Sequence, residues 1–225
     1  MTRPLVIVIL LAAAPAAAQT AAPTRPARVE IDAGGGWLGG AHAGSIDANL
    51  RAASATPTPF RVFSVDSRFA AAPTVHVKAG YALSRRFMVE GGLTLSHPEL
   101  RASISNDVEA APPITIAERI DQYGIDASLV FMIRELAISA RTLPFVSGGA
   151  GYLRQLHEGQ TVVEQGHLFH AGGGLKHWLL ARERGFLNGA GVRVDARLYV
   201  MSGGIAFEDR PRPRGAVSGS VFLAF

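Results

Sequence analysis

The sequence predicts an all-β protein whose fold is an eight-stranded antiparallel up-and-down transmembrane β-barrel. Three observations lead to this prediction. Apolar and polar residues alternate with a period of two in eight segments, as they do in strands whose two faces meet different surroundings. Nearly every charged residue of these segments lies on the face opposite the Val, Leu and Ile side chains. The last segment alternates through Val221 and Leu223 up to Phe225, as in the closing strand of a membrane barrel.

The N-terminal residues have the pattern of a cleavable signal peptide. Arg3 precedes an apolar run, and small alanines follow at a suitable cleavage position. The run is interrupted by Pro15 and is shorter than the roughly 20 residues that a helix needs to cross a bilayer, which disfavours an anchored helix. The expected segments are a signal peptide at 1–18, a short lead-in at 19–27 and one barrel domain at 28–225.

Composition excludes several classes of protein. The chain has no cysteine, so we expect neither a disulfide nor a lipid-modified cysteine. The net charge is +4, but the Arg and Lys residues are scattered singly and form no stripe that could follow a phosphate backbone. A nucleic-acid partner is therefore not expected.

The eight predicted strands share alternation and turn signals at their ends. They cover residues 28–39, 73–83, 87–96, 115–133, 144–156, 161–178, 190–201 and 217–225. The apolar faces of the first four are made, in order, by Val29, Ile31 and Trp37; Val75, Val77 and Tyr81; Phe87, Val89 and Leu93; and Tyr123, Ile125 and Leu129.

The last four strands differ in clarity. The fifth is so rich in glycine that its two faces cannot be assigned from the pattern. The sixth sets Phe169 and Leu175 opposite His170 and Lys176. The seventh is the clearest, because aliphatic residues alternate strictly with charged or aromatic ones throughout 190–201. An even number of strands of about 10 residues is what a membrane barrel requires.

The connections fall into two groups. The short turns at 84–86, 134–142 and 180–188 are expected to face the periplasm, and the loops at 41–72, 105–114, 156–160 and 202–213 to face outward. The segment 41–72 is the longest and the best candidate for contact with an extracellular partner, because surface loops often carry recognition. A merely solvated loop is the alternative. Its apolar patch at Phe60, Val62 and Phe63 could instead extend the second strand above the bilayer.

The stretches 144–152, 191–199 and 221–225, in this order and spacing, resemble the OmpA-like family of eight-stranded outer-membrane barrels. The resemblance covers about residues 28–225. It implies a monomer in the outer membrane of a Gram-negative bacterium, in contact with membrane lipid and with the barrel-assembly machinery. The corresponding assembly signal would be Val221, Leu223 and Phe225.

The charged face of the strands predicts a filled lumen. An eight-stranded barrel is just wide enough for side chains to fill its interior, and buried charges must be paired. We therefore expect a plugging network of ion pairs, with a narrow ion path gated by those pairs as the alternative. The predicted network is Glu30, Asp32, His76, Lys78, Glu90, Asp126, His170, Lys176, Arg193, Asp195 and Arg197.

Catalysis is not expected. Ser147 or Ser202 with His157 could in principle serve a lipid acyl hydrolase, but no nucleophile elbow or spacing holds such a pair together. His167 and His170 would point to opposite faces of a strand, so no metal site is predicted. The glycine runs lead into no helix, so no phosphate cradle or other cofactor site is predicted.

Three functions stay open in order of preference. The first is an envelope protein with a structural or surface-interacting role and a plugged lumen. The second is a narrow, porin-like channel for small solutes, and the third is a lipid-modifying enzyme. At the level of the fold, a soluble ligand-binding barrel is the alternative.

Overall fold

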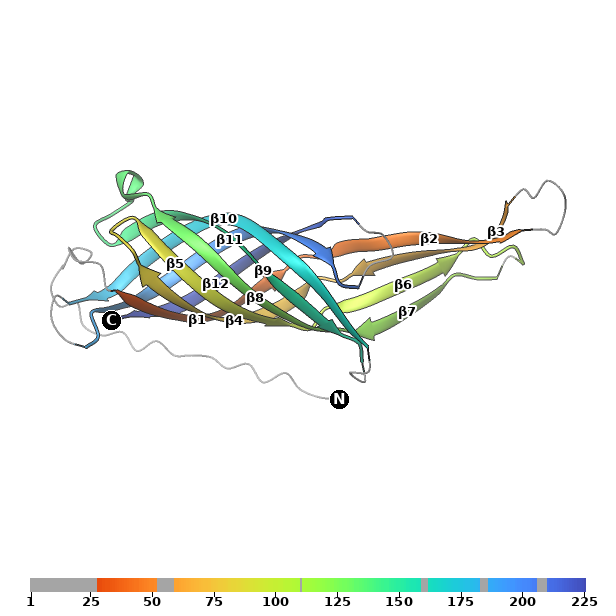
Figure 1. Cartoon of the computed structure of the whole chain (residues 1–225), viewed down its shortest axis with the longest axis horizontal. Helices are drawn as coiled ribbons and strands as arrows, with labels where there is room; N and C mark the ends of the chain where they lie inside the picture. Colours follow the sequence, from red (N-terminus) through yellow and green to blue (C-terminus); the bar gives the residue numbers. More distant parts are fainter. Residues whose placement is uncertain (1–27, 52–58, 110, 159–161, 183–185, 206–209) are drawn as a thin grey trace.

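The structure, a computed structural model, describes residues 28–51, 59–109, 111–158, 162–182, 186–205 and 210–225. The predicted signal peptide at 1–18 and the lead-in at 19–27 lie outside the described residues. The described chain folds into two β-sheets (Figure 1). One is a closed barrel with the strand order β1-β12-β11-β10-β9-β8-β5-β4, and the other is a four-stranded sheet with the order β2-β3-β6-β7.

The bounds of the elements are as follows. The barrel strands are β1 (Val29–Leu38), β4 (Ala72–Ala82), β5 (Phe87–Ser96), β8 (Asp121–Met132), β9 (Thr142–Leu156), β10 (Val163–Ala181), β11 (Gly189–Gly203) and β12 (Arg212–Ala224). The second sheet consists of β2 (Ala41–Arg51), β3 (Pro59–Phe69), β6 (Glu99–Ser105) and β7 (Ile114–Arg119). A single 3₁₀ turn, η1 (Arg134–Leu136), follows β8.

The predicted barrel is confirmed. All neighbouring pairs are antiparallel, and the first and last strands close the sheet, with Ile31 opposite Leu223. Closure leaves no strand edge, so the backbone N–H and C=O groups of the wall are paired within the sheet. In the described residues no helix has both the length and the apolar character to cross a membrane.

The barrel is apolar outside and charged inside. On β11, Val194 is 54% exposed and Leu198 53%, whereas Arg193 is 1% exposed and Arg197 5%. Every barrel strand alternates exposed and buried side chains in this way, because successive side chains of a strand point to opposite faces, but β9 carries no charged residue on its inner face. A water-soluble sheet has the reverse arrangement, with its apolar face hidden and its polar face wet.

Both ends of the described chain lie at one end of the barrel, which we call the terminal end (Figure 1). There the backbone N–H of Phe225 donates to the Val29 carbonyl at 2.8 Å. The short turns between β4 and β5, between β8 and β9, and between β10 and β11 lie at this same end. The second sheet projects from the opposite end, which we call the sheet end (Figure 1).

The prediction of a loop at 41–72 is wrong, because β2 and β3 form a hairpin within this segment. The loop predicted at 105–114 is the connection of a second hairpin, β6–β7. The prediction of one strand over 115–133 is also wrong, because this segment contains two strands that belong to different sheets. They meet at Ile120, which is fully buried and donates its N–H to the Pro98 carbonyl at 2.9 Å. The pairing of β3 with β6, which are distant in the sequence, joins the two hairpins into one sheet.

The second sheet is a continuation of half of the barrel wall. Strand β1 leads into β2, β3 into β4, β5 into β6 and β7 into β8. The barrel strands β1, β4, β5 and β8 are neighbours in the wall, and their extensions keep the same order. The apolar patch at Phe60, Val62 and Phe63 lies on β3, which leads into β4. This agrees with the alternative that the patch extends the second predicted strand. The other half of the wall, β9 to β12, has no such extension in the described residues.

The outward apolar surface gives a first prediction. Replacing Val194 with Lys places a charge on the outer wall, and near the bilayer midplane such a charge costs about 2–4 kcal/mol. Unfolding in urea from lipid vesicles should show this loss. Ile138→Lys, in the exposed turn at the terminal end, is the matched control and should change the free energy by less than about 0.5 kcal/mol. Equal costs for the two variants would contradict an outer wall in contact with lipid.

Candidate functional site: the interior of the barrel

The structure places the whole predicted network inside the barrel. Each member has less than a tenth of its surface exposed. The residues are Glu30, Asp32, His76, Lys78, Glu90, Asp126, His170, Lys176, Arg193, Asp195 and Arg197.

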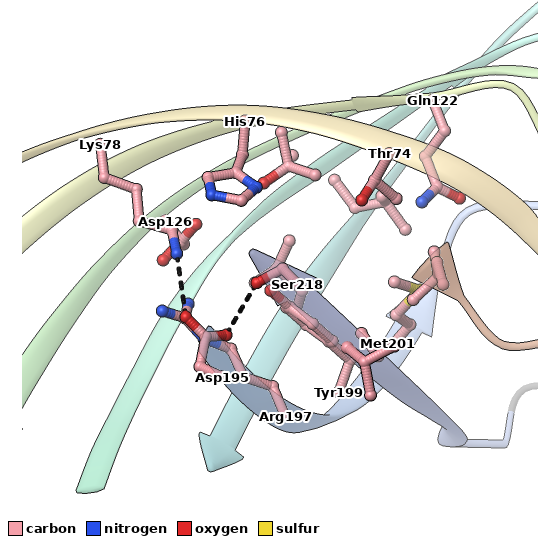
Figure 2. A pocket seen from close by; sticks show the side chains of 17 residues that line it. Thr74, His76, Lys78, Gln122, Asp126, Asp195, Arg197, Tyr199, Met201 and Ser218 are labelled. Atoms are coloured by element: carbon pink, nitrogen blue, oxygen red, sulfur yellow. Dashed lines mark hydrogen bonds and ion pairs between the residues drawn. The ribbon is translucent and has the colours of Figure 1, made fainter. Parts of the chain in front are cut away.

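Asp195 is the centre of this network. One carboxylate oxygen, Oδ1, accepts from Arg197 Nε at 3.1 Å. The other, Oδ2, lies 3.2 Å from Arg193 Nε and 3.4 Å from Lys78 Nζ. Ser218 donates its hydroxyl to Oδ1 at 3.0 Å (Figure 2). The alternation of β11 explains the cluster, because its three successive inward positions, 193, 195 and 197, hold a cation, an anion and a cation.

Arg193 links this centre to the next carboxylate. Its Nη1 donates to Glu90 Oε1 at 2.5 Å, and its guanidinium lies 4.3 Å from the centroid of the Phe145 ring. A guanidinium can bind a carboxylate along its edge and an aromatic ring on its face at the same time. Arg193 therefore connects the ionic layer with the apolar residues below it at the terminal end.

A further ion pair and a contact between a carboxylate and a histidine flank this centre. Lys176 Nζ binds the carboxylate of Glu30 and also lies 4.4 Å from the centroid of the Phe222 ring. Asp32 lies 3.4 Å from His76 Nε2 and accepts from the Ser220 hydroxyl at 2.7 Å. These pairs join strands on both sides of the seam between β1 and β12, so they tie the barrel across its closure.

Asp126, Ser128 and His170 form a compact polar cluster. Asp126 Oδ2 and Ser128 Oγ both approach Nε2 of His170, each at 3.1 Å, and Ser128 Oγ lies 3.0 Å from Asp126 Oδ2. In a Ser-His-Asp relay the serine and the acid bind opposite ring nitrogens. Here both bind the same nitrogen, so the histidine cannot pass a proton from one to the other. The cluster is suited to holding β8 and β10 together.

Apolar layers cover the network at both ends. At the terminal end lie two clusters, one of Met88, Val130, Met132 and Phe145, the other of Trp178, Phe222 and Ala224. Toward the sheet end lies a cluster of Leu38, Leu153, Leu168 and Met201. Ions enclosed between apolar layers have little access to water, so their pairing with one another becomes the main compensation for lost hydration.

Between the network and the apolar layer of the sheet end lies a small cavity (Figure 2). His76, Lys78, Asp126, Asp195, Arg197 and Tyr199 contribute to its wall. Its volume of about 50 Å³ is enough for about three or four water molecules. This cavity therefore has room for hydration of the ion pairs but not for a solute of the size of a sugar or an amino acid.

Inward-facing glycines provide the room for these long side chains. A Cβ on Gly92 would lie 3.0 Å from Asp126 Oδ1, and one on Gly149 would lie 2.7 Å from His170 Nε2 and only 2.2 Å from the Ala127 carbonyl oxygen. A Cβ on Gly172 would likewise lie 2.2 Å from the Ala196 carbonyl oxygen and 2.9 Å from Cγ of Arg197. The glycine runs thus have a packing role, and the structure also resolves the faces of β9, where Phe145, Ser147 and Leu153 point inward.

Two buried arginines of the barrel interior were not predicted. Arg212 and Arg214 lie on the inner face of β12 near the sheet end, and both are buried. Arg212 donates to the carbonyls of Gly203 and Ile205, and Arg214 Nε donates to the Gly39 carbonyl at 2.8 Å. The predicted eighth strand began at 217. Extending its alternation backwards would have placed both arginines on the inner face.

The described contacts join neither candidate nucleophile to His157, and Ser202 lies opposite His167 in the pairing of β10 with β11. Ser147 points into the lumen and not to the outer surface, as the hydrolase alternative would need. His157 Nδ1 is 2.9 Å from Glu118 Oε1, a contact that joins the end of β9 to β7. His167 is exposed while His170 is buried, so the two histidines lie on opposite faces.

The residues of the proposed assembly signal lie at the terminal end of β12. Val221 and Leu223 point outward and are 54% and 40% exposed. The ring of Phe225 lies 5.0 Å from that of Phe186, centroid to centroid. Their role as an assembly signal stays a prediction.

The Asp195 cluster gives a second prediction. Asp195→Asn leaves three cations without their shared anion, and breaking a buried ion pair in this way costs about 3–5 kcal/mol. Ser218→Ala removes one hydrogen bond to the same carboxylate and should cost about 1 kcal/mol. Urea unfolding of both variants in the same detergent is the measurement. A cost for Asp195→Asn no larger than that for Ser218→Ala would show that the carboxylate does not hold the cluster together.

The chain matches no protein-family model and no curated protein. Solved structures that match it include Neisserial surface protein A, at 10% identity and a TM-score of 0.49, covering 88% of this chain and 97% of that one. OprG, an outer membrane protein from Pseudomonas aeruginosa, matches at 8% identity and a TM-score of 0.49, covering 90% and 99%. Ail, the attachment invasion locus protein of Yersinia pestis, matches at 12% identity and a TM-score of 0.38, covering 89% and 99%. The fold described above rests on the strand pairing of this chain itself.

Proposed function

We propose that this chain is an outer-membrane barrel of a Gram-negative bacterium whose role is to hold a rigid sheet at the cell surface for interaction with an external partner. One observation carries the proposal: half of the barrel wall continues as an ordered sheet beyond a barrel whose interior is filled. The barrel acts as the anchor, and the sheet, formed by two hairpins, is the interacting part.

The outer surface supports the membrane location. Along the wall the exposed side chains are aliphatic, and aromatic residues lie toward both ends. Tyr81 and Phe87 are exposed near the terminal end, and Trp37 and Tyr123 near the sheet end. Aromatic side chains at the two rims of an apolar band are typical of membrane barrels, because these rings favour the interface between lipid and water.

The same arrangement supports the orientation. In outer-membrane barrels the short turns face the periplasm and the long connections face outward. The terminal end carries the short turns, so it would face the periplasm, and the second sheet would lie outside the cell. Val221, Leu223 and Phe225 would then be available to the assembly machinery from the periplasmic side.

The packed interior supports an anchor and disfavours the channel. Conduction needs a hydrated path, whereas here the ion pairs fill the middle of the lumen and apolar layers cover them. A channel would require the Asp195 cluster to rearrange, which would break several pairs at once.

Labelling of cysteine variants tests the location and orientation. The chain has no cysteine, so a single introduced thiol reports on one position. Thr115→Cys, on β7, should react with a membrane-impermeant maleimide on intact cells. Arg85→Cys, in the turn between β4 and β5, should react only after the outer membrane is permeabilised. Labelling of both variants, or of neither, on intact cells would contradict the proposed placement.

Planar-bilayer recording tests the closed lumen. The inserted wild-type protein should give no discrete conductance steps, because its ion pairs leave no continuous water path. A sixteen-stranded porin inserted under the same conditions is the positive control. Discrete steps whose size changes in Glu90→Ala or Arg197→Ala would favour the channel over the anchor.

A further inference from the structure

The two faces of the second sheet differ sharply. One row across the sheet consists of Ile46, Val65, Ile104 and Ile114, one residue from each strand and each opposite the next. Neighbouring rows of the same face are also apolar. We call this surface the inner face; it is made up of Ile46, Ala48, Leu50, Phe60, Phe63, Val65, Ala102, Ile104, Ile114 and Ile116.

The opposite face, the outer face, is polar and internally paired. Ser64 donates to Asp47 at 2.7 Å, and His42 lies 2.7 Å from Asp66. Arg101 pairs with Glu99 at the base of the sheet. This face therefore suits contact with water, and its polar groups need no further partner.

In the second sheet, the positions of the apolar face and the polar face are reversed relative to the barrel wall. In the wall the apolar side chains point away from the axis and the charged ones toward it. In the sheet the apolar face is continuous with the lumen side, because at its base Phe69 and Leu100 pack against Ile120 and Ile205. The guanidinium of Arg214, a lumen residue, lies 5.4 Å from the centroid of the Phe69 ring. The inversion occurs where the wall would leave the lipid, so the outward face turns from lipid-facing to water-facing.

Beyond this base the inner face has no cover among the described residues. Ile46, Leu50, Phe60, Ile114 and Ile116 are between 51% and 63% exposed. A half-exposed side chain of this size leaves about 100 Å² in contact with water. The five together expose about 500 Å², and the half-buried neighbours bring the face to roughly 700 Å², more than the largest apolar patch of a typical monomer.

We propose that a second copy of this chain, with its barrel pointing the opposite way in a facing membrane, covers the inner face, so that two sheets pack face to face in the water between the membranes and the chain is not the monomer that the resemblance implies. The proposal rests on the proposed function in that the sheet is taken to lie beyond the bilayer. A stable interface buries about 800 Å² on each partner, and the inner face comes close to that area. A sheet that is apolar on one face needs a second layer to bury it, and the described part of the chain supplies only one layer there.

The chemistry of the inner face favours a copy over an unrelated partner. None of its side chains is charged, so the contact of one inner face with another leaves no ion buried without a counter-ion. A two-fold axis would bring the same patch of both copies together, which is the commonest arrangement in homodimers. The strands extend far enough, since eleven residues in β2 span about 35 Å, and stacked sheets need a separation of only about 10 Å.

The test compares two neighbouring residues on opposite faces of β7. Ile116 belongs to the inner face, Thr115 points to the outer face, and both are exposed. Sedimentation equilibrium of the full chain in a density-matched detergent should show a dimer for the wild type and for Thr115→Asp. Ile116→Asp should dissociate at least about tenfold more readily, because it buries an unpaired charge.

Cross-linking provides a readout that does not depend on micelle occupancy. With a bis-maleimide of about 10 Å reach, matched to the spacing of stacked sheets, Ile116→Cys should give covalent dimers and Thr115→Cys should not. A monomeric wild type, or a dimer equally stable in both Asp variants, would overturn the proposal; the second result would assign the contact to the barrel walls. A third result would also overturn the proposal: a monomeric wild type that copurifies with bound lipid, while Ile116→Asp copurifies without it. Lipid would then be the molecule that covers the inner face. Intact-cell labelling of Thr115→Cys separates these outcomes from a failure of the proposed function.

Discussion

A closed sheet in a bilayer can place ions in only one region, the lumen, because hydrocarbon offers them neither water nor counter-ions. The rest of this structure depends on that constraint. It fixes which face of each strand is charged, and it requires the enclosed ions to neutralise one another. Asp195 satisfies the requirement most fully, since its single carboxylate lies beside three cations contributed by β4 and β11. The apolar clusters above and below then separate this ionic layer from the solvent at both mouths.

The constraint ends where the wall leaves the lipid, and the sequence changes with it. On the part of β8 near the sheet end the inward residues are polar, as in Gln122 and Asp126, whereas on β7 the residues of the same parity are Ile114 and Ile116, followed by Glu118 at the base. The same set of strands is therefore adapted to lipid along the barrel and to water along the second sheet. Ile120 lies at the transition, in contact with the hydrophobic cluster that closes the barrel mouth. The stability of the sheet is thus connected to that of the barrel through the cluster rather than through the strands alone.

Much of the barrel could be predicted because its information is local. The alternation around Arg193 and Asp195 specifies a strand and, once lipid is assumed, the direction of each side chain. The second sheet could not be predicted in this way. In 41–72 the pattern is broken by residues such as Gly44, which has a φ of 120° at an irregularity in the pairing of β2 with β3. Pairing of β3 with β6 joins residues some forty positions apart, which no local pattern encodes. The ion-pair partner of each lumen charge could not be predicted either. Alternation shows which face of its strand a side chain occupies, but not which side chain of another strand lies beside it. Arg212 and Arg214 were missed for a simpler reason, the late start assigned to the last strand.

The inward glycines also constrain how this sequence can vary over evolutionary time. A Cβ at position 149 would lie 2.2 Å from the carbonyl oxygen of Ala127, and a backbone atom cannot be shortened by mutation. Beside position 92 the nearest atom belongs to a side chain, the carboxylate of Asp126 at 3.0 Å. Glycine should therefore persist at position 149 among descendants of this chain whatever residue stands at position 170. Position 92 should instead covary with position 126, where a smaller residue on β8 would make room for a larger one on β5.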